Sequence, residues 1–176
     1  MSKFDNAAYT YQAVHRLVSK GRRRLAILAP SPTLSYYTHS RIGFEKALSE
    51  TEATEVSMRR LTTEMPLGAI REAMMTMMAS RDAPDGIVSV SGSATIAMVA
   101  GMEAAGKRLG VDVDLVSKQS ADFLNWIRPD IYTVNEDVRL AGQELGKAVM
   151  ARIAGTEPER LQSISQPAWS PMAPGE

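Results

Sequence analysis

The sequence has no cysteine among its 176 residues and has few aromatic side chains, at 6%. Without cysteine a chain can form no disulfide framework, no thiolate zinc site and no cysteine nucleophile. This absence suits a reducing compartment, so we expect a cytoplasmic protein. The two histidines, His15 and His39, lack the spacing of metal-binding histidine motifs, so we expect no metal site and no cofactor.

Long apolar runs and net charge are also absent. No segment reaches the ~18 apolar residues that a membrane span needs, and residues 1–6 lack the apolar stretch of a signal peptide. The 20 basic and 20 acidic side chains cancel, which gives no global field toward nucleic acid. We therefore expect no membrane partner. The basic run at residues 22–24 either binds an anion or forms a solvated turn.

Apolar patterning predicts short buried strands that alternate with amphipathic helices. The strand starts lie roughly thirty residues apart, and each interval between them holds one helix, which is typical of repeated βαβ units. We therefore predict an α/β fold with a parallel, Rossmann-like sheet flanked by helices and right-handed crossovers. The expected strands are 25–29, 55–61, 86–90, 113–116 and 131–134, and the expected helices are 6–20, 36–49, 66–78, 94–105 and 136–153.

The last third of the sequence departs from this alternation. Residues 117–130 have no clear period. Asn135 is predicted to cap a long helix whose apolar face, with Val138, Leu145 and Val149, needs a large apolar partner. Residues 161–165 fit a last strand, and residues 167–176 are predicted to be irregular.

Candidate binding residues follow the predicted strands. Ser91, Gly92 and Ser93 come after a buried strand and lack the patterns of dinucleotide or phosphate loops, so they form either a plain turn with serine caps or a contact for a polar ligand. Arg41 either reaches into a cleft or pairs with Glu45 one helical turn on. Trp126 either stacks on a sugar face or packs. No serine elbow or matched triad is present, so we predict no catalytic residue and no enzyme activity.

Several segments, in this order, resemble the effector-binding region of transcriptional regulators similar to the lac repressor (the LacI/GalR family). They include residues 17–28, residues 41–48, residues 83–88 and the helix that contains Gly142, and the likeness spans residues 5–166. The resemblance implies a fold like that of periplasmic binding proteins of type I, in which two Rossmann-like subdomains clamp a small ligand. It also implies a homodimer that binds operator DNA only through a helix-turn-helix headpiece that these residues do not include.

The resemblance also divides the chain. Residues 5–128 would form the C-terminal effector-binding subdomain, and residues 129–155 would form a strand and a helix that join the N-terminal subdomain. Residues 156–176 would form a return strand and an irregular tail. The first βα units of the N-terminal subdomain have no counterpart in this sequence.

The effector site is likewise implied by the resemblance. Arg41 matches the family arginine that holds the effector, whereas the family's acidic positions fall on Ser91–Gly92 and on residues 117–120, where no carboxylate is found. Lys118 adds a positive charge there, which leaves room for a sugar, a less hydroxylated compound or an anionic effector. The predicted effector-binding residues are Arg41, Ser35, Tyr37, Ser91, Gln119 and Trp126.

The predicted function is therefore the effector-binding and dimerising part of a bacterial transcriptional regulator, a repressor, that responds to a small polar ligand. Two alternatives remain open from sequence. One is a solute-binding protein of the same fold that serves transport, and the other is a small α/β enzyme that acts on a phosphorylated substrate. A helix-turn-helix segment upstream would favour the regulator, and a signal peptide would favour the solute-binding protein.

Overall fold

The computed structural model describes residues 2–58 and 61–170, and within them the main sheet has six strands in the order β3-β2-β4-β5-β6-β8. Neighbouring strands run parallel from β3 to β6, and β8 pairs antiparallel with β6. This architecture confirms the predicted α/β class. The strands are β2 (Arg24–Leu28), β3 (Thr54–Glu55), β4 (Gly86–Ser89), β5 (Asp114–Gln119), β6 (Tyr132–Asn135) and β8 (Ala168–Trp169).

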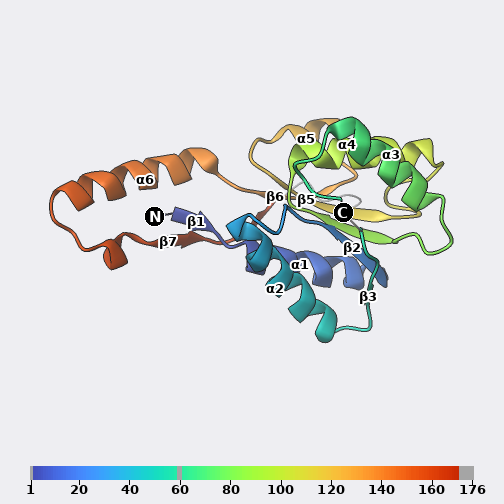
Figure 1. Ribbon diagram of the computed structural model, residues 1–176, viewed down its shortest axis with the longest axis horizontal. Coiled ribbons are helices and arrows are strands. Elements are labelled where there is room, and N and C mark those ends of the chain that lie inside the picture. Colours follow the sequence, from blue (N-terminus) through green and yellow to red (C-terminus); the bar gives the residue numbers. More distant parts are fainter. Residues whose placement is uncertain (1, 59–60, 171–176) are drawn as a thin grey trace.

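Helices cover both faces of this sheet (Figure 1). On one face lie α1 (Asn6–Ser19) and α2 (Ser35–Ser49), and on the other lie α3 (Leu67–Met78) and α4 (Gly92–Ala104) with the short α5 (Phe123–Ile127). Because successive strand residues point to opposite faces, Ile87 packs with α3 and α4 while Val88 packs with α1 and α2. The central strands are thus buried on both sides, as in other parallel sheets.

Each pair of helices meets at a glycine. A Cβ atom at Gly43 in α2 would overlap the carbonyl oxygen of Ala7 in α1. A Cβ atom at Gly101 in α4 would overlap the carbonyl oxygen of Arg71 and lie 2.8 Å from the Cβ of Met74, both in α3. The absence of a side chain therefore sets how closely the helices on each face approach.

A second part of the chain projects from one end of the sheet (Figure 1). It consists of α6 (Val138–Ile153), the 3₁₀ helix η1 (Pro158–Leu161) and two parallel strands, β1 (Ser2–Phe4) and β7 (Ser163–Ser165). We call this part, residues 2–4 and 138–165, the arm, and call residues 6–135 and 168–170 the sheet region. No residue of α6, all of which the structure describes, is buried. The apolar face of α6 that needed a partner is thus uncovered.

Several boundaries differ from the prediction because pairing partners decide them. The strand expected over residues 55–61 is only β3, at Thr54–Glu55, and residues 59–60 lie outside the described part. The strand expected over 113–116 runs on to Gln119 because its last residues pair with β6. Asn135 ends β6, and Asp137 caps α6 in its place, accepting a hydrogen bond of 2.8 Å from the Leu140 amide.

The region expected to be an irregular tail contains a strand. β8 pairs with β6, and the Trp169 indole N–H donates to Gln12 Oε1 in α1 at 2.9 Å. Residues 171–176 of that expected tail lie outside the described part. Since β6 lies inside the main sheet, the part of the segment 129–155 that leaves the sheet region is residues 138–155, most of which form α6.

Candidate functional site

A cleft of about 870 Å³ opens where the carboxyl ends of the parallel strands face the arm. Its walls come from the starts of α1, α2, α4 and α5, from the residues that follow β4, β5 and β6, and from β1 and β7 of the arm. In open α/β sheets, ligands collect at this edge because strand ends and helix starts present polar groups there. The location therefore matches the edge that the strand pattern predicts.

The serine turn after β4 forms one wall. The Ser91 hydroxyl caps α4 by accepting from the Ala94 amide at 3.4 Å, and it lies 3.2 Å from the Ser93 hydroxyl. Thr95 holds the turn from behind, since its hydroxyl donates to the Ser91 carbonyl at 2.8 Å. A fixed turn thus presents two hydroxyl groups to the cleft. These are neutral donors and acceptors suited to a polar ligand.

Gln119, at the end of β5, lines the cleft but uses its amide within the protein. Its oxygen accepts from the Leu124 amide at 3.1 Å, and its nitrogen donates to Asn135 Oδ1 at 2.9 Å. The residue is only 2% exposed. Gln119 therefore joins the start of α5 to the end of β6 and shapes the wall.

Lys118 is the neighbouring residue, and its positive charge is already paired. Its ammonium lies 3.0 Å from Glu136 Oε2 and donates to Asn6 Oδ1 at 3.0 Å. Asp5 and Glu64 also line the cleft, so among the described lining residues carboxylates outnumber ammonium groups. The positive charge that favoured an anionic effector is therefore compensated, and the geometry suits a neutral ligand rich in hydroxyl donors.

Tyr36 and Glu64 form the rim beside α2. The Tyr36 hydroxyl donates to Glu64 Oε1 at 3.4 Å, and burial together with the Glu64 charge raises the pKa of this phenol. Although partial burial opposes it, hydrogen bonds from Thr63 and from the Ser31 amide keep the pKa of Glu64 below its usual value. The carboxylate is therefore ionised at neutral pH and can accept hydrogen bonds from a ligand.

The predicted effector residues divide into two groups. Ser35, Ser91 and Gln119 line the cleft, whereas Arg41, Tyr37 and Trp126 are not among its lining residues. Tyr37 packs against the core under α1 and α2, and Trp126 is 75% exposed on α5.

Arg41 is not among the residues that line the cleft, and its guanidinium is held by carboxylates. Its guanidinium bonds to Glu45 and to Glu55, each at 2.7 Å. Hydrogen bonding to Glu55, against the opposing effect of burial, raises the pKa of Arg41. The sequence left two alternatives open for Arg41, a cleft or a pair with Glu45. The structure shows the pair with Glu45 and adds Glu55 as a second partner.

Other cleft residues were not predicted from sequence. Asn6, Phe123 and Glu136 all line the cleft. Glu136 directly follows β6 and Asn6 opens α1, so the rule that strand ends and helix starts meet at one edge gave a signal for both. Phe123 carried no such signal, because the short helix α5 was not predicted.

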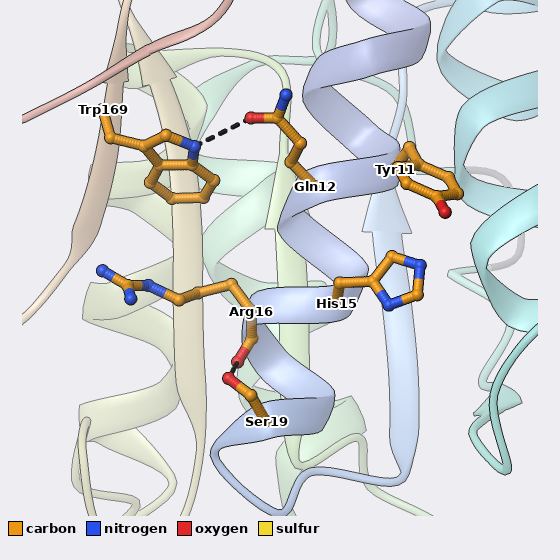
Figure 2. A pocket seen from close by; sticks show the side chains of 6 residues that line it. All are labelled: Tyr11, Gln12, His15, Arg16, Ser19 and Trp169. Carbon is orange, nitrogen blue, oxygen red and sulfur yellow. Dashed lines mark hydrogen bonds between the residues drawn. The ribbon is translucent and has the colours of Figure 1, made fainter.

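A second hollow of about 470 Å³ lies on the outer side of α1, as Figure 2 shows. Its side chains engage each other or nearby groups. Trp169 bonds to Gln12, the Tyr11 hydroxyl donates to Glu50 at 2.7 Å, and the His15 ring lies 4.5 Å from the Tyr11 ring. This hollow is open to solvent on its outer side.

In residues 2–58 and 61–170, no group of three or more histidine, cysteine, aspartate or glutamate side chains could hold a metal ion. In the same part of the chain, no helix combines the length and the apolarity that crossing a membrane requires.

Residues 14–171 match the periplasmic binding protein-like domain, and the chain belongs to this family. Its relatives include two regulators that carry a helix-turn-helix. It is 28% identical to the HTH-type transcriptional regulator CelR of Thermobifida fusca over 89% of this chain and 47% of that protein. It is 26% identical to the HTH-type transcriptional regulator RafR of Escherichia coli over 96% of this chain and 50% of that protein. The chain thus spans about half the length of these relatives.

Solved structures of similar proteins share the fold. A regulatory protein of the LacI family from Chloroflexus aggregans superposes with a TM-score of 0.84 at 22% identity, covering 96% of this chain and 60% of that one. The complex of the transcriptional regulator CelR with cellobiose gives a TM-score of 0.83 at 22% identity, covering 96% of this chain and 52% of that one. These relatives are regulators and not enzymes.

Proposed function

We propose that this chain is the effector-binding part of a LacI-type transcriptional regulator that responds to a small sugar. The observation that supports this most directly is the cleft at the carboxyl edge of a parallel sheet, lined by serine hydroxyls, a tyrosine and carboxylates. Sugars offer many hydroxyl donors and acceptors together with apolar ring faces, which such a wall can bind. One of the similar solved structures is a complex of CelR with cellobiose, which agrees with this class of ligand.

Within the cleft, we assign ligand contact to Ser35, Ser91, Ser93 and the rim carboxylate of Glu64. Tyr36 and Phe123 present aromatic rings from α2 and α5, against which a sugar ring can pack. Gln119 shapes the wall, and its amide is not free for the ligand because it bonds to Leu124 and Asn135. Arg41 supports the outer side of α2 and has no role in ligand binding.

The whole protein would act in the cytoplasm as a homodimer and bind operator DNA through a helix-turn-helix segment outside these 176 residues. The ligand would bind one orientation of the arm better than another, and this difference in affinity would change DNA binding. Exposed apolar side chains on α5 and α6 are candidates for contacts with a second copy, among them Trp126 at 75% and Ile153 at 76% exposure.

The test is ligand-induced stabilisation of this chain. Cellobiose, lactose and ribose are added in turn, and the shift of the melting temperature is measured for the parent chain, Ser35→Trp and Arg41→Ala. We expect a shift with at least one sugar in the parent, its loss in Ser35→Trp because the indole fills the cleft, and its retention in Arg41→Ala.

Two outcomes contradict the proposal. If none of the three sugars shifts the melting temperature of the parent, the assignment to small sugars fails. If the shift survives in Ser35→Trp and disappears in Arg41→Ala, the ligand binds at the outer side of α2 and the cleft is not its site.

A further inference from the structure

Lys118 lies where the sheet region and the arm join. In the described part of the chain, the backbone passes between these two parts at three points, namely residues 4–6, residues 135–138 and residues 165–168. Figure 1 shows the arm leaving the sheet at the end of β6. Lys118 is at the end of β5 and belongs to the sheet region, and its ammonium contacts the first two of these junctions.

The contacts come from both sides of the ammonium. At the first junction, Nζ donates to Asn6 Oδ1 at 3.0 Å and lies 5.0 Å from the centroid of the Phe4 ring. At the second junction, Nζ lies 3.0 Å from Glu136 Oε2. The Lys118 side chain is 11% exposed and the Glu136 side chain 30%. A charge–charge contact with this little water is stronger than an ion pair on an open surface.

The groups that receive the ammonium are themselves held in place. The Asn6 amide donates to the Phe4 carbonyl at 3.3 Å, which orients its oxygen toward Lys118. The third junction is joined to the first by Asp5, whose backbone amide donates to the Ser165 carbonyl at 2.9 Å and whose carboxylate accepts from Gln166 at 3.2 Å. Lys118 therefore links the first junction to the second, and Asp5 links the first junction to the third.

We propose that Lys118 is a positioning residue that fixes the orientation of the arm relative to the sheet region. Because β1 and β7 of the arm form one side of the cleft, this orientation sets how far the cleft is open. A ligand that competes for Glu136 or Asn6 would release the arm. This consequence for the ligand response rests on the proposed function, whereas the orientation itself does not.

The experiment measures the arm orientation without any ligand. The chain contains no cysteine, so Glu72→Cys in α3 and Gln143→Cys in α6 supply two defined spin-label sites. Pulsed electron–electron resonance then gives the distribution of distances between the arm and the sheet region. In Lys118→Met and Glu136→Gln we expect the population outside the parent's main distance to rise about tenfold, since a charge-assisted hydrogen bond is lost. Lys118→Arg keeps the charge and is expected to retain the parent distribution.

Lys147→Met is the matched control. It removes the pair between Lys147 and Glu144 at 2.8 Å, which lies wholly within α6, so the distribution is expected to stay unchanged. Parent-like distributions in both Lys118→Met and Glu136→Gln would overturn the proposal, and so would equal broadening in Lys147→Met. If Lys118→Met fails to fold by circular dichroism, Glu136→Gln carries the comparison. Failure of all three sugars to bind would contradict the proposed function and leave this ligand-free result intact.

Discussion

The sheet region and the arm are built from similar helices but differ in what covers them. In the sheet region, α1, α3 and α4 each bury an apolar face against the strands. In the arm, α6 is longer than any of these and buries no residue. The comparison shows that an apolar stripe of helical period predicts a helix, while burial depends on a partner. The same kind of substitution should therefore have different effects in the two regions.

The largest difference is expected for apolar truncations. Phe44→Ala in α2 removes a fully buried ring and should lower the free energy of unfolding by about 4 kcal/mol. Ile153→Ala in α6 removes a side chain that is 76% exposed and should change it by less than about 0.5 kcal/mol. Urea denaturation of both variants measures this difference. Equal losses would mean that the α6 face is covered in solution.

Glycine substitutions should have opposite signs in the two regions. Gly43→Ala forces a methyl group into the Ala7 carbonyl and should destabilise the chain by about 3 kcal/mol. Gly146→Ala in α6 meets no atom within 4 Å and should stabilise it by about 0.5–1 kcal/mol, because alanine favours the helix. Thermal unfolding gives both values. A destabilising Gly146→Ala would indicate that another surface approaches α6 closely.

Tyr9 gives the sheet region a dependence on alkaline pH. Its buried hydroxyl donates to the Ser89 carbonyl at 2.5 Å, and burial raises its pKa well above the ordinary value of 10.0. Above pH 10 the unfolded chain releases this proton and the folded chain keeps it, so stability falls as the pH rises. Tyr9→Phe should cost about 1 kcal/mol at neutral pH and reduce the alkaline loss. Urea titrations of parent and variant at neutral and alkaline pH give the comparison, and identical alkaline slopes would contradict it.

The smallest effect on folding is expected for Val149→Asp in α6. The side chain is 50% exposed, so the free energy of unfolding should change by less than about 0.5 kcal/mol. If the face with Val138, Leu145 and Val149 joins two copies, sedimentation should show association of the parent chain and its loss in this variant. Trp126→Asp on α5 is the matched variant for the other exposed face. A parent chain that sediments as a monomer would contradict association through either face.

Much of the sheet region was predictable because its patterns are local. Buried strands next to turn residues, such as Gly86 to Ser89 before the serine turn, fixed both the parallel sheet and the edge where the cleft lies. The direction of Arg41 was not predictable in this way, since one residue along a helix turns a side chain by about 100°. Judged from spacing alone, the side chain of Arg41 could either pair with Glu45 or enter a cleft, and the sequence did not decide between the two.

The differences between the predicted and the observed elements depended on partners distant in sequence. β8 is too short to show a pattern of its own and exists because β6 offers it an edge. Asn135 and Asp137 are both good caps, and the pairing of Asn135 with Gln119 of β5 decided which one starts α6. Lys118 appeared as an added positive charge in the sequence, and only the structure placed Glu136 beside it.

The parallel pairing of β1 with β7 has a consequence for the order of folding. Ser2 pairs with Ser163 and Phe4 with Ser165, so β1 finds its partner only after the residues of the sheet region as far as β6, and those of α6, have been synthesised. The strand pairs from β2 to β6 close much shorter loops, and contacts of low sequence separation form sooner. During translation the parallel strands β2 to β6 can therefore pair while residues 2–4 still lack their partner, and β1 joins β7 after that pairing.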